Sequence, residues 1–211
     1  MRKLLALAAS AGMILALGVA GTASASADSG TDRVITPKQS MTVVINEVQT
    51  HGLSAGDQFV ELRNVSPNSI DLAGYQLLRC ETSGNETVIQ TFGPGTVLAP
   101  YGQIGQHLLI APSAVKGVAP DVIASPSISQ QGGAILRTPF NNGGQKVDGV
   151  GFSPLAGSCL EQTNASGPAA SVPVFNTWNL SAQRNHTATD TDTNSIDFGL
   201  ITRSPQNRFS V

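Results

Sequence analysis

Short apolar runs rich in β-branched residues recur along the chain from Met41 onward, and they restrict the fold more than any other feature. The runs lie at residues 41–48, 59–63, 75–78, 87–92, 107–111, 121–124, 134–137 and 146–152. Gly, Pro, Asn and Ser separate them, as they separate strands in globular proteins. Strands of this length at this spacing predict an all-β fold, either a sandwich or a barrel.

The residues around these runs support the same fold class. Asn141, Asn142, Gly143 and Gly144 join two runs and tolerate positive φ, which predicts a β-hairpin. Charged residues make up only 12% of the chain, which disfavours the long surface helices of a helical or α/β protein. Beyond Gly157 the pattern weakens, so we expect a long irregular connection that packs an aromatic anchor, Trp178, against the sheets.

The N-terminus has the three parts of a secretory signal peptide. A short basic start precedes an apolar run over residues 4–20, and Ala-Ser-Ala at residues 25–27 supplies a cleavage site. We expect residues 1–27 to be this peptide, with cleavage after Ala27. A retained membrane anchor is the alternative, but small and polar residues interrupt the apolar run.

The rest of the chain is expected to be a flexible leader over residues 28–40 and a single domain over residues 41–211. No apolar stretch after the signal peptide is long enough to span a bilayer, so we expect a secreted, extracellular protein. Cleavage would remove the positive charges of Arg2 and Lys3 and change the formal net charge from −2 to −4. An acidic chain with scattered Lys and Arg does not attract polyanions, so no nucleic-acid partner is expected.

The chain contains two cysteines, Cys80 and Cys159. An exported protein matures in an oxidising compartment, where two cysteines usually form a disulfide. Two buried thiols or one reactive thiol are the alternatives. Two cysteines without a histidine pair at ligand spacing do not make a zinc site.

Catalytic motifs are absent from the sequence. None of the three histidines, His51, His107 and His186, belongs to a nucleophile or metalloprotease motif. Glu47 and Glu61 lie inside apolar strand-like runs, where an ionised carboxylate needs a partner. The two glutamates either form the acid pair of a small hydrolase or have a structural role, exposed to solvent or bound to an arginine. The arginines considered for that role are Arg63, Arg79 and Arg184.

The segment Thr-Asp-Thr-Asp-Thr-Asn-Ser-Ile-Asp at residues 189–197 has regularly spaced acidic and amide side chains. Asp190, Asp192 and Asn194 fit the first three ligand positions of a calcium loop, and Asp197 could close a smaller calcium site. Ser195 and Ile201 stand where such a loop requires Gly and Glu. The alternative is a series of turns in which these short side chains accept backbone N–H groups and contact Arg184.

Several blocks of sequence resemble those of one known family. They are Val-Val-Ile-Asn-Glu-Val at residues 43–48, Val-Glu-Leu and Asp-Leu-Ala-Gly-Tyr within residues 58–77, and a closing segment with residues 181–184, 190–198 and 205–207. Together these blocks resemble a lamin tail domain of the bacterial, exported kind, with weaker similarity between them. Tyr101 and Gln206 depart from the family pattern in two turns.

The resemblance implies an immunoglobulin-like β-sandwich and a protein-interaction role, not an enzyme. The leading hypothesis is therefore a secreted, non-catalytic module that binds a cell-surface or extracellular protein or polysaccharide. The alternatives are a hydrolase that uses Glu47 and Glu61, and a carbohydrate-binding module stabilised by calcium. No other cofactor is expected.

Overall fold

The structure is a computed structural model that describes residues 40–52, 55–142, 144–161, 169 and 179–210. The predicted signal peptide, nearly all of the predicted leader and Trp178 lie outside the described residues. The described residues all belong to one compact unit that spans residues 36–211. Among them, no helix is long and apolar enough to cross a membrane.

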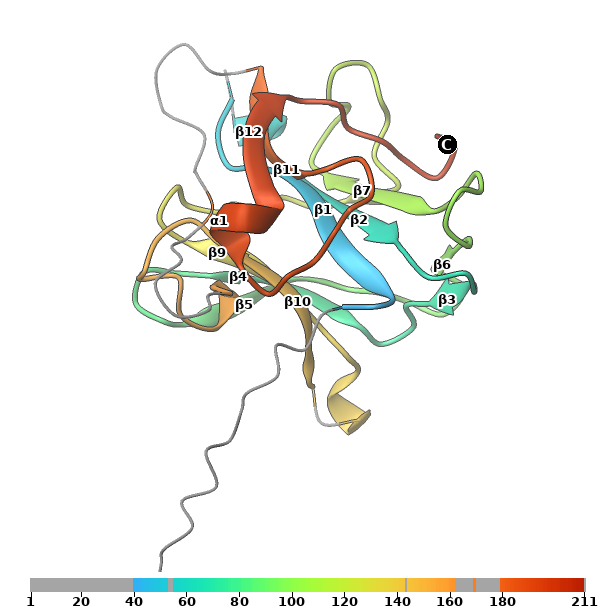
Figure 1. The fold of residues 1–211 in the computed structure, drawn as a ribbon, viewed down its shortest axis with the longest axis horizontal. Coiled ribbons are helices and arrows are strands. Elements are labelled where there is room, and N and C mark those ends of the chain that lie inside the picture. Colours follow the sequence, from blue (N-terminus) through green and yellow to red (C-terminus); the bar gives the residue numbers. More distant parts are fainter. Residues whose placement is uncertain (1–39, 53–54, 143, 162–168, 170–178, 211) are drawn as a thin grey trace, which may run out of the picture. The chain divides into compact units, whose positions relative to one another are not determined.

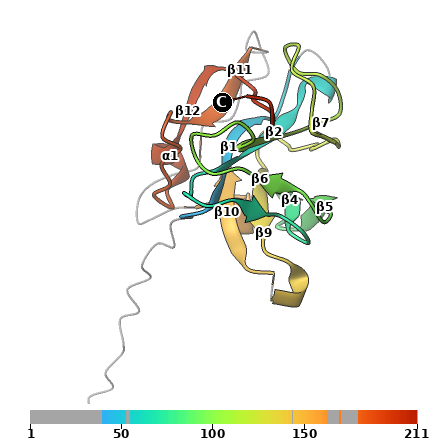
Figure 2. The ribbon, with the colours of Figure 1, turned by 90° about the vertical axis from the view of Figure 1, so that its right-hand side faces the viewer.

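The domain is an all-β sandwich built from two sheets, which Figure 2 shows one above the other. The six-stranded sheet has the order β12 (Phe198–Thr202), β11 (Leu180–Arg184), β1 (Val43–Gln49), β2 (Phe59–Asn64), β7 (His107–Ala111) and β8 (Val122–Ile123). The four-stranded sheet has the order β10 (Lys146–Gly151), β9 (Gly133–Arg137), β4 (Gln76–Cys80) and β5 (Glu86–Thr91). Neighbouring strands are antiparallel, except that β7 and β8 are parallel.

The remaining elements are short. Two-residue strands β3 (Ile70–Asp71) and β6 (Val97–Leu98) pair with each other. The helical turns are η1 (Ala55–Asp57), η2 (Phe140–Asn142), η3 (Gly157–Cys159) and α1 (Asn194–Asp197). Helix η2 lies in the connection between β9 and β10, which extends below the sheets in Figure 1.

The core lies between the two sheets and follows the two-residue alternation of strand side chains. Ile45, Leu62 and Ile110 from the six-stranded sheet pack in the same cluster as Leu77 and Leu136 from the four-stranded sheet. The alternate side chains of β1, β2 and β7 face the other way. Most of these are buried too, because other segments of the chain cover that face.

A β-bulge in β1 changes which side chains reach this outer face. Ile45 pairs with Leu62, but Glu47 pairs with Glu61, so Asn46 is an extra residue in the strand. Ile45 and Val48 both lie in the inter-sheet core. Asn46 and Glu47 therefore both project to the outer face.

The predicted all-β fold class is confirmed, and each predicted run overlaps a strand of the structure. The hairpin predicted around residues 141–144 is the β9–β10 pair. The segment after Gly157 differs from the prediction, because β11 and β12 add two strands beside β1. These strands carry a weak apolar signal, since Ala182 and Phe198 are their buried core residues and the other side chains are largely polar, small or exposed.

Candidate functional site

Two groups of buried polar side chains are the candidate sites of the domain. The first, called the inter-sheet cluster, consists of Arg184 with Asp148, Glu161, Asp190 and Asp197. The second, called the outer-face cluster, consists of Asn46, Glu47, Glu61, His107 and Ser181. Buried charges require partners, so the geometry of each group decides what it does.

Arg184, the last residue of β11, lies at the centre of the inter-sheet cluster with its side chain fully buried. Its guanidinium lies 2.8 Å from Asp148 Oδ1, 3.0 Å from Asp197 Oδ2 and 3.4 Å from Asp190 Oδ1. Glu161 is farther away, at 3.9 Å. The guanidinium also donates to two backbone carbonyls and stacks 4.5 Å from the centre of the Phe198 ring. Every face of this cation is therefore occupied, which fixes β11 against β10 and the 189–197 segment.

The cluster contains more carboxyl groups than cations, and burial decides where the excess charge is neutralised. Burial and the nearby Asp148 raise the pKa of Glu161 to about 9, despite Lys146 at 3.1 Å. Burial also raises the pKa of Asp148, but Arg184 and two backbone N–H groups oppose the shift. Burial acts to lower the pKa of Arg184, but the surrounding carboxylates together outweigh it and raise this pKa, so the guanidinium stays charged. At neutral pH the cluster therefore keeps a proton on Glu161.

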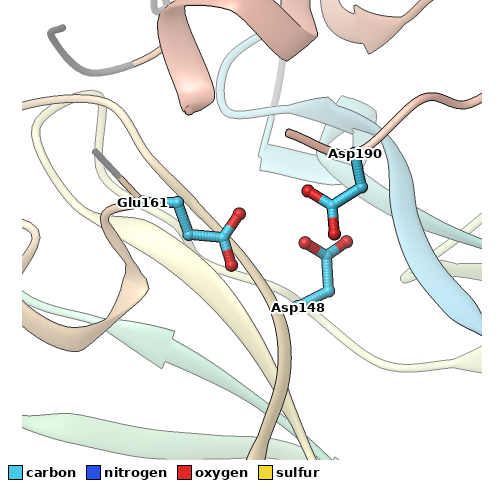
Figure 3. Close-up of side chains that lie close together, drawn as sticks. All are labelled: Asp148, Glu161 and Asp190. Atoms are coloured by element: carbon cyan, nitrogen blue, oxygen red, sulfur yellow. The ribbon is translucent and has the colours of Figure 1, made fainter. Parts of the chain in front are cut away.

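Asp148, Glu161 and Asp190 point toward one another, as Figure 3 shows. One oxygen from each of the three lies within 4.8 Å of the others, an arrangement that could hold a metal ion. Arg184 already provides positive charge at this position, because it contacts all three carboxyl groups. The arrangement fits internal charge compensation at least as well as metal binding.

The four residues of the predicted calcium loop make different contacts in the structure. Asp190 accepts from the backbone N–H groups of Ser40 and Asp192 and contacts Arg184. The carboxylate of Asp197 accepts from the backbone N–H groups of Thr191 and Thr193.

The other two residues make contacts of their own. Asp192 has a positive φ of 53° and its backbone N–H bonds Asp190. The amide of Asn194 bonds the backbone of Gly149, Gly151 and Glu161, so it ties the segment to β10. These contacts match the alternative of turns closed by short side chains.

We expect the thermal midpoint to be the same with added calcium and with a chelator. The reason is that Asp190 and Asp197 already accept hydrogen bonds from the backbone and from Arg184, so an ion would have to replace these donors. The measurement is a melting scan in each condition, with magnesium as the control ion. A midpoint several degrees higher in calcium alone would contradict this expectation.

Stability should decrease as the pH rises through the raised pKa values of Glu47 and Glu161. Glu161, with a pKa of about 9, binds its proton more tightly in the folded protein than at its ordinary value of 4.5. This contribution is fully present below pH 4.5 and is lost as the pH approaches 9, at about 1.4 kcal/mol per pH unit for a fully effective group. Urea unfolding between pH 5 and about pH 9 measures it.

Glu161→Gln keeps the shape of the neutral side chain and should reduce the loss of stability at alkaline pH. Glu86→Gln is the control, because Arg137 lowers the pKa of Glu86, and this variant should keep the alkaline loss. An equal alkaline loss in the wild type and in Glu161→Gln would show that Glu161 is not the source.

The outer-face cluster lies across β11, β1, β2 and β7. Glu47 Oε1 accepts from the Ser181 hydroxyl at 2.6 Å and from the backbone N–H of Ser204 at 2.9 Å. Burial, followed by the charge of Glu61, raises the pKa of Glu47 to about 7. Glu61 Oε1 contacts the Asn46 amide at 2.7 Å and His107 Nδ1 at 2.9 Å, and Oε2 accepts from the backbone N–H of Gln206.

Glu47 and Glu61 thus share one face of the sheet, as direct neighbours on β1 and β2. Both side chains are fully buried under residues 204–206, so this face is not an open cleft. In the described part of the chain, Arg184 lies in the other cluster, whereas Arg63 contacts Tyr101 and Arg79 contacts Glu81. The partners of the two glutamates are hydroxyls, amides, backbone N–H groups and His107.

An open cavity of about 280 Å³ lies away from both clusters. It is lined by Arg79, Cys80, Glu81, Thr82, Ser127 and Ser129. No residue of the inter-sheet cluster or of the outer-face cluster lines it.

The predicted disulfide between Cys80 and Cys159 is confirmed. It links the end of β4 to η3, and both residues are buried. Glycine is required beside it, because a Cβ on Gly133 would lie 2.6 Å from Cys159 Cβ and 2.3 Å from the Val150 carbonyl oxygen.

Sequence reasoning did not single out Asp148, Glu161 or the contact of His107 with Glu61. Asp148 had a usable signal, because it is a charged residue inside a strand-like run, as Glu47 and Glu61 are. His107 likewise opens the strand-like run 107–111, whereas Glu161 has no such local signal. Their roles depend on residues brought together by the pairing of strands that are distant in sequence.

Comparison with known proteins gives no family for this chain. No protein-family description matches the sequence, and no curated protein is significantly similar to it.

Proposed function

We propose that the protein is an exported, non-catalytic β-sandwich module, related to lamin tail domains and immunoglobulin-like in topology, that binds a cell-surface or extracellular partner. The supporting observation is that the two carboxyl groups suited to acid–base catalysis, those of Glu47 and Glu61, are buried and already accept hydrogen bonds. Glu47 and Glu61 are 0% exposed, and each accepts hydrogen bonds from the protein itself. A hydrolase needs its acid pair to face substrate and water.

An exposed aromatic side chain provides a candidate contact for the partner, which we expect to be a protein or a polysaccharide. Phe140 lies in η2, on the β9–β10 connection that extends from the sheets, and is 84% exposed. Exposed aromatic residues on projecting loops are frequent anchors in binding surfaces. We therefore place the contact with the partner at this connection.

Two measurements test this function on the mature protein. Incubation with polysaccharide, phosphoester and peptide substrates should give no turnover above that of Glu47→Gln. Labelled protein should bind to the surface of the cells that produce it, and Phe140→Ser should weaken this binding by about tenfold or more. Leu155→Ser is the control, since Leu155 is also exposed but lies after β10. Turnover that Glu47→Gln abolishes would overturn the proposal.

N-terminal sequencing tests the predicted export. The N-terminal sequence of the protein recovered outside the cells should begin at Asp28, directly after the predicted cleavage site. A protein that keeps residues 1–27 and stays with the membrane would favour the retained anchor.

A hydrolase that uses Glu47 and Glu61 is the second candidate. The two residues pair directly across β1 and β2, and the pKa of Glu47 is raised to about 7, as expected of a general acid. This function requires residues 204–206 to leave the outer face. The substrate assay above distinguishes the two candidates.

A further inference from the structure

A lysine amine and an asparagine side-chain amide contact the same carboxyl group at the edge of the inter-sheet cluster. Lys146 Nζ lies 3.1 Å from Glu161 Oε1, and Asn194 Nδ2 donates to Glu161 Oε2 at 3.4 Å. Lys146 begins β10, Glu161 follows η3 and Asn194 begins α1, so the three residues come from separate parts of the chain. An amine and a carboxamide that share one carboxyl group have the components of a transamidation: a nucleophile, an acyl group and a proton carrier.

The side-chain carbonyl of Asn194 already lies against two backbone donors. Asn194 Oδ1 accepts from the backbone N–H of Gly151 at 2.8 Å and from that of Glu161 at 2.9 Å. Nδ2 donates to the Gly149 carbonyl at 2.8 Å, which fixes the orientation of the amide. Two N–H groups on one carbonyl oxygen polarise its carbon and stabilise the oxyanion that forms when a nucleophile adds there. The Asn194 side chain is therefore activated for attack at Cγ.

Gly149 leaves room for the lysine amine beside this amide. A Cβ at position 149 would lie 2.8 Å from Lys146 Nζ, and the carbonyl of the same glycine accepts from Asn194 Nδ2. The amine also donates to the Ser158 carbonyl at 2.9 Å. The flexible stem of lysine can rotate and bring Nζ from the Glu161 carboxyl group to the carbon of the amide.

The burial of the three side chains suits an acyl transfer that avoids hydrolysis. Asn194 and Glu161 are buried, whereas the Lys146 side chain is partly exposed. A dry amide keeps water from competing with the amine, and the exposed lysine gives solvent a route to the nucleophile. Glu161 also keeps a proton at neutral pH, because burial and Asp148 raise its pKa to about 9. It can therefore act as a general acid.

We propose that Lys146 and Asn194 form an intramolecular isopeptide bond, with Glu161 as the catalytic residue that carries the protons. The structure shows the three side chains before this reaction. The bond would link the start of β10 to the segment before β12, and it would form whatever partner the protein binds.

The atoms and charges of the reaction balance without a further reagent. Lys146 releases one proton to solvent, and its neutral Nζ then attacks Cγ of Asn194, so that the carbonyl electron pair moves to Oδ1. The acid form of Glu161 donates its proton from Oε2 to Nδ2 and accepts a proton from Nζ at Oε1. The Cγ–Nδ2 bond breaks with its electron pair on nitrogen, and ammonia leaves. Glu161 is thereby returned to its acid form.

Mass spectrometry of the intact wild-type protein tests the bond. Apart from the hydrogens lost in the disulfide, the mass should lie below that calculated from the sequence by one molecule of ammonia. Lys146→Arg, which keeps a cation but removes the amine, should show the full mass, and so should Glu161→Gln. Lys116→Arg is the matched control, because Lys116 donates to the backbone of Arg203, and it should lose ammonia as the wild type does. A wild-type protein at the full mass would overturn the proposal.

Tryptic digestion of the reduced protein locates the link. Trypsin does not cleave after an acylated lysine, so residues 138–184 should stay intact and should be joined to residues 185–203 in one branched peptide. Fragmentation of this peptide should place the link between Lys146 and Asn194. Loss of ammonia from an unbranched peptide of residues 185–203 would instead indicate a succinimide at Asn194, and that result would refute the isopeptide bond.

The two variants test the role of the acid separately from the bond. Circular dichroism in the near ultraviolet establishes whether each variant is folded. A folded Glu161→Gln protein that yields as much branched peptide as the wild type would refute the role given to Glu161. If a variant does not fold, the branched peptide of the wild-type protein decides the proposal alone, because its detection requires no substitution.

Discussion

Replacing Arg184 with methionine is expected to destabilise the protein by about 3–5 kcal/mol, a large part of the stability of a domain of this size. The guanidinium is fully buried and contacts Asp148, Asp190 and Asp197 within 3.4 Å. Its removal leaves these carboxyl groups in the interior without a cation. They must then take up protons or admit water, and both responses cost folding free energy.

Urea unfolding of Arg184→Met and of a control variant measures this loss. Arg79→Met is the matched control, because Arg79 pairs with Glu81 at 3.5 Å on the surface, and such a pair contributes about 0–1 kcal/mol. Arg184→Lys should fall between them, since lysine keeps the charge but cannot replace the several directed bonds of the guanidinium. A midpoint for Arg184→Met equal to that of Arg79→Met would contradict the role given to the cluster.

The variant should also lose less stability at low pH than at neutral pH. Protonation of the carboxyl groups removes the charge that Arg184 neutralises, so the difference between Arg184→Met and the wild type should shrink as the pH falls. A difference that stays constant with pH would point to lost packing against Phe198 rather than lost charge.

The strands were predictable wherever their side chains alternate against one core. Val43, Ile45 and Val48 face the inter-sheet core, and the predicted run over residues 41–48 covers β1 except for its last residue. β11, with the sequence Leu-Ser-Ala-Gln-Arg, was missed because its only apolar residue in that core is the small Ala182. Its place beside β1 comes from tertiary pairing and from Arg184, neither of which leaves a periodic apolar signal.

The contacts of the inter-sheet cluster and the outer-face cluster were predictable only where they join residues that are close in sequence. Turns closed by Asp190 and Asp197 follow from short side chains near their own backbone, which the sequence shows directly. The shared face of Glu47 and Glu61 instead depends on the bulge at Asn46, which shifts the register by one residue. The burial of both glutamates depends on residues 204–206, far away in the sequence.

Loss of the Cys80–Cys159 disulfide is expected to destabilise the protein by about 4–5 kcal/mol. The two cysteines are 79 positions apart, so the bond closes a long loop that contains β5 to β10. In the chain-entropy account, a loop of this length removes about this much conformational free energy from the unfolded state. The measurement is urea unfolding with and without a reductant, after a thiol assay has confirmed that the bond is open.

The double variant Cys80→Ala, Cys159→Ala separates this effect from other actions of the reductant, because its midpoint should not respond to reduction. Its loss should be close to that of the reduced wild type, plus the cost of a small cavity beside Gly133. Because the bond acts mainly on the unfolded chain, the folded variant should keep the hydrogen bonds of both clusters and the native spectrum below its midpoint. A variant that loses this spectrum in the absence of urea would show that the bond also shapes the folded state, through the contact of η3 with β4 and β10.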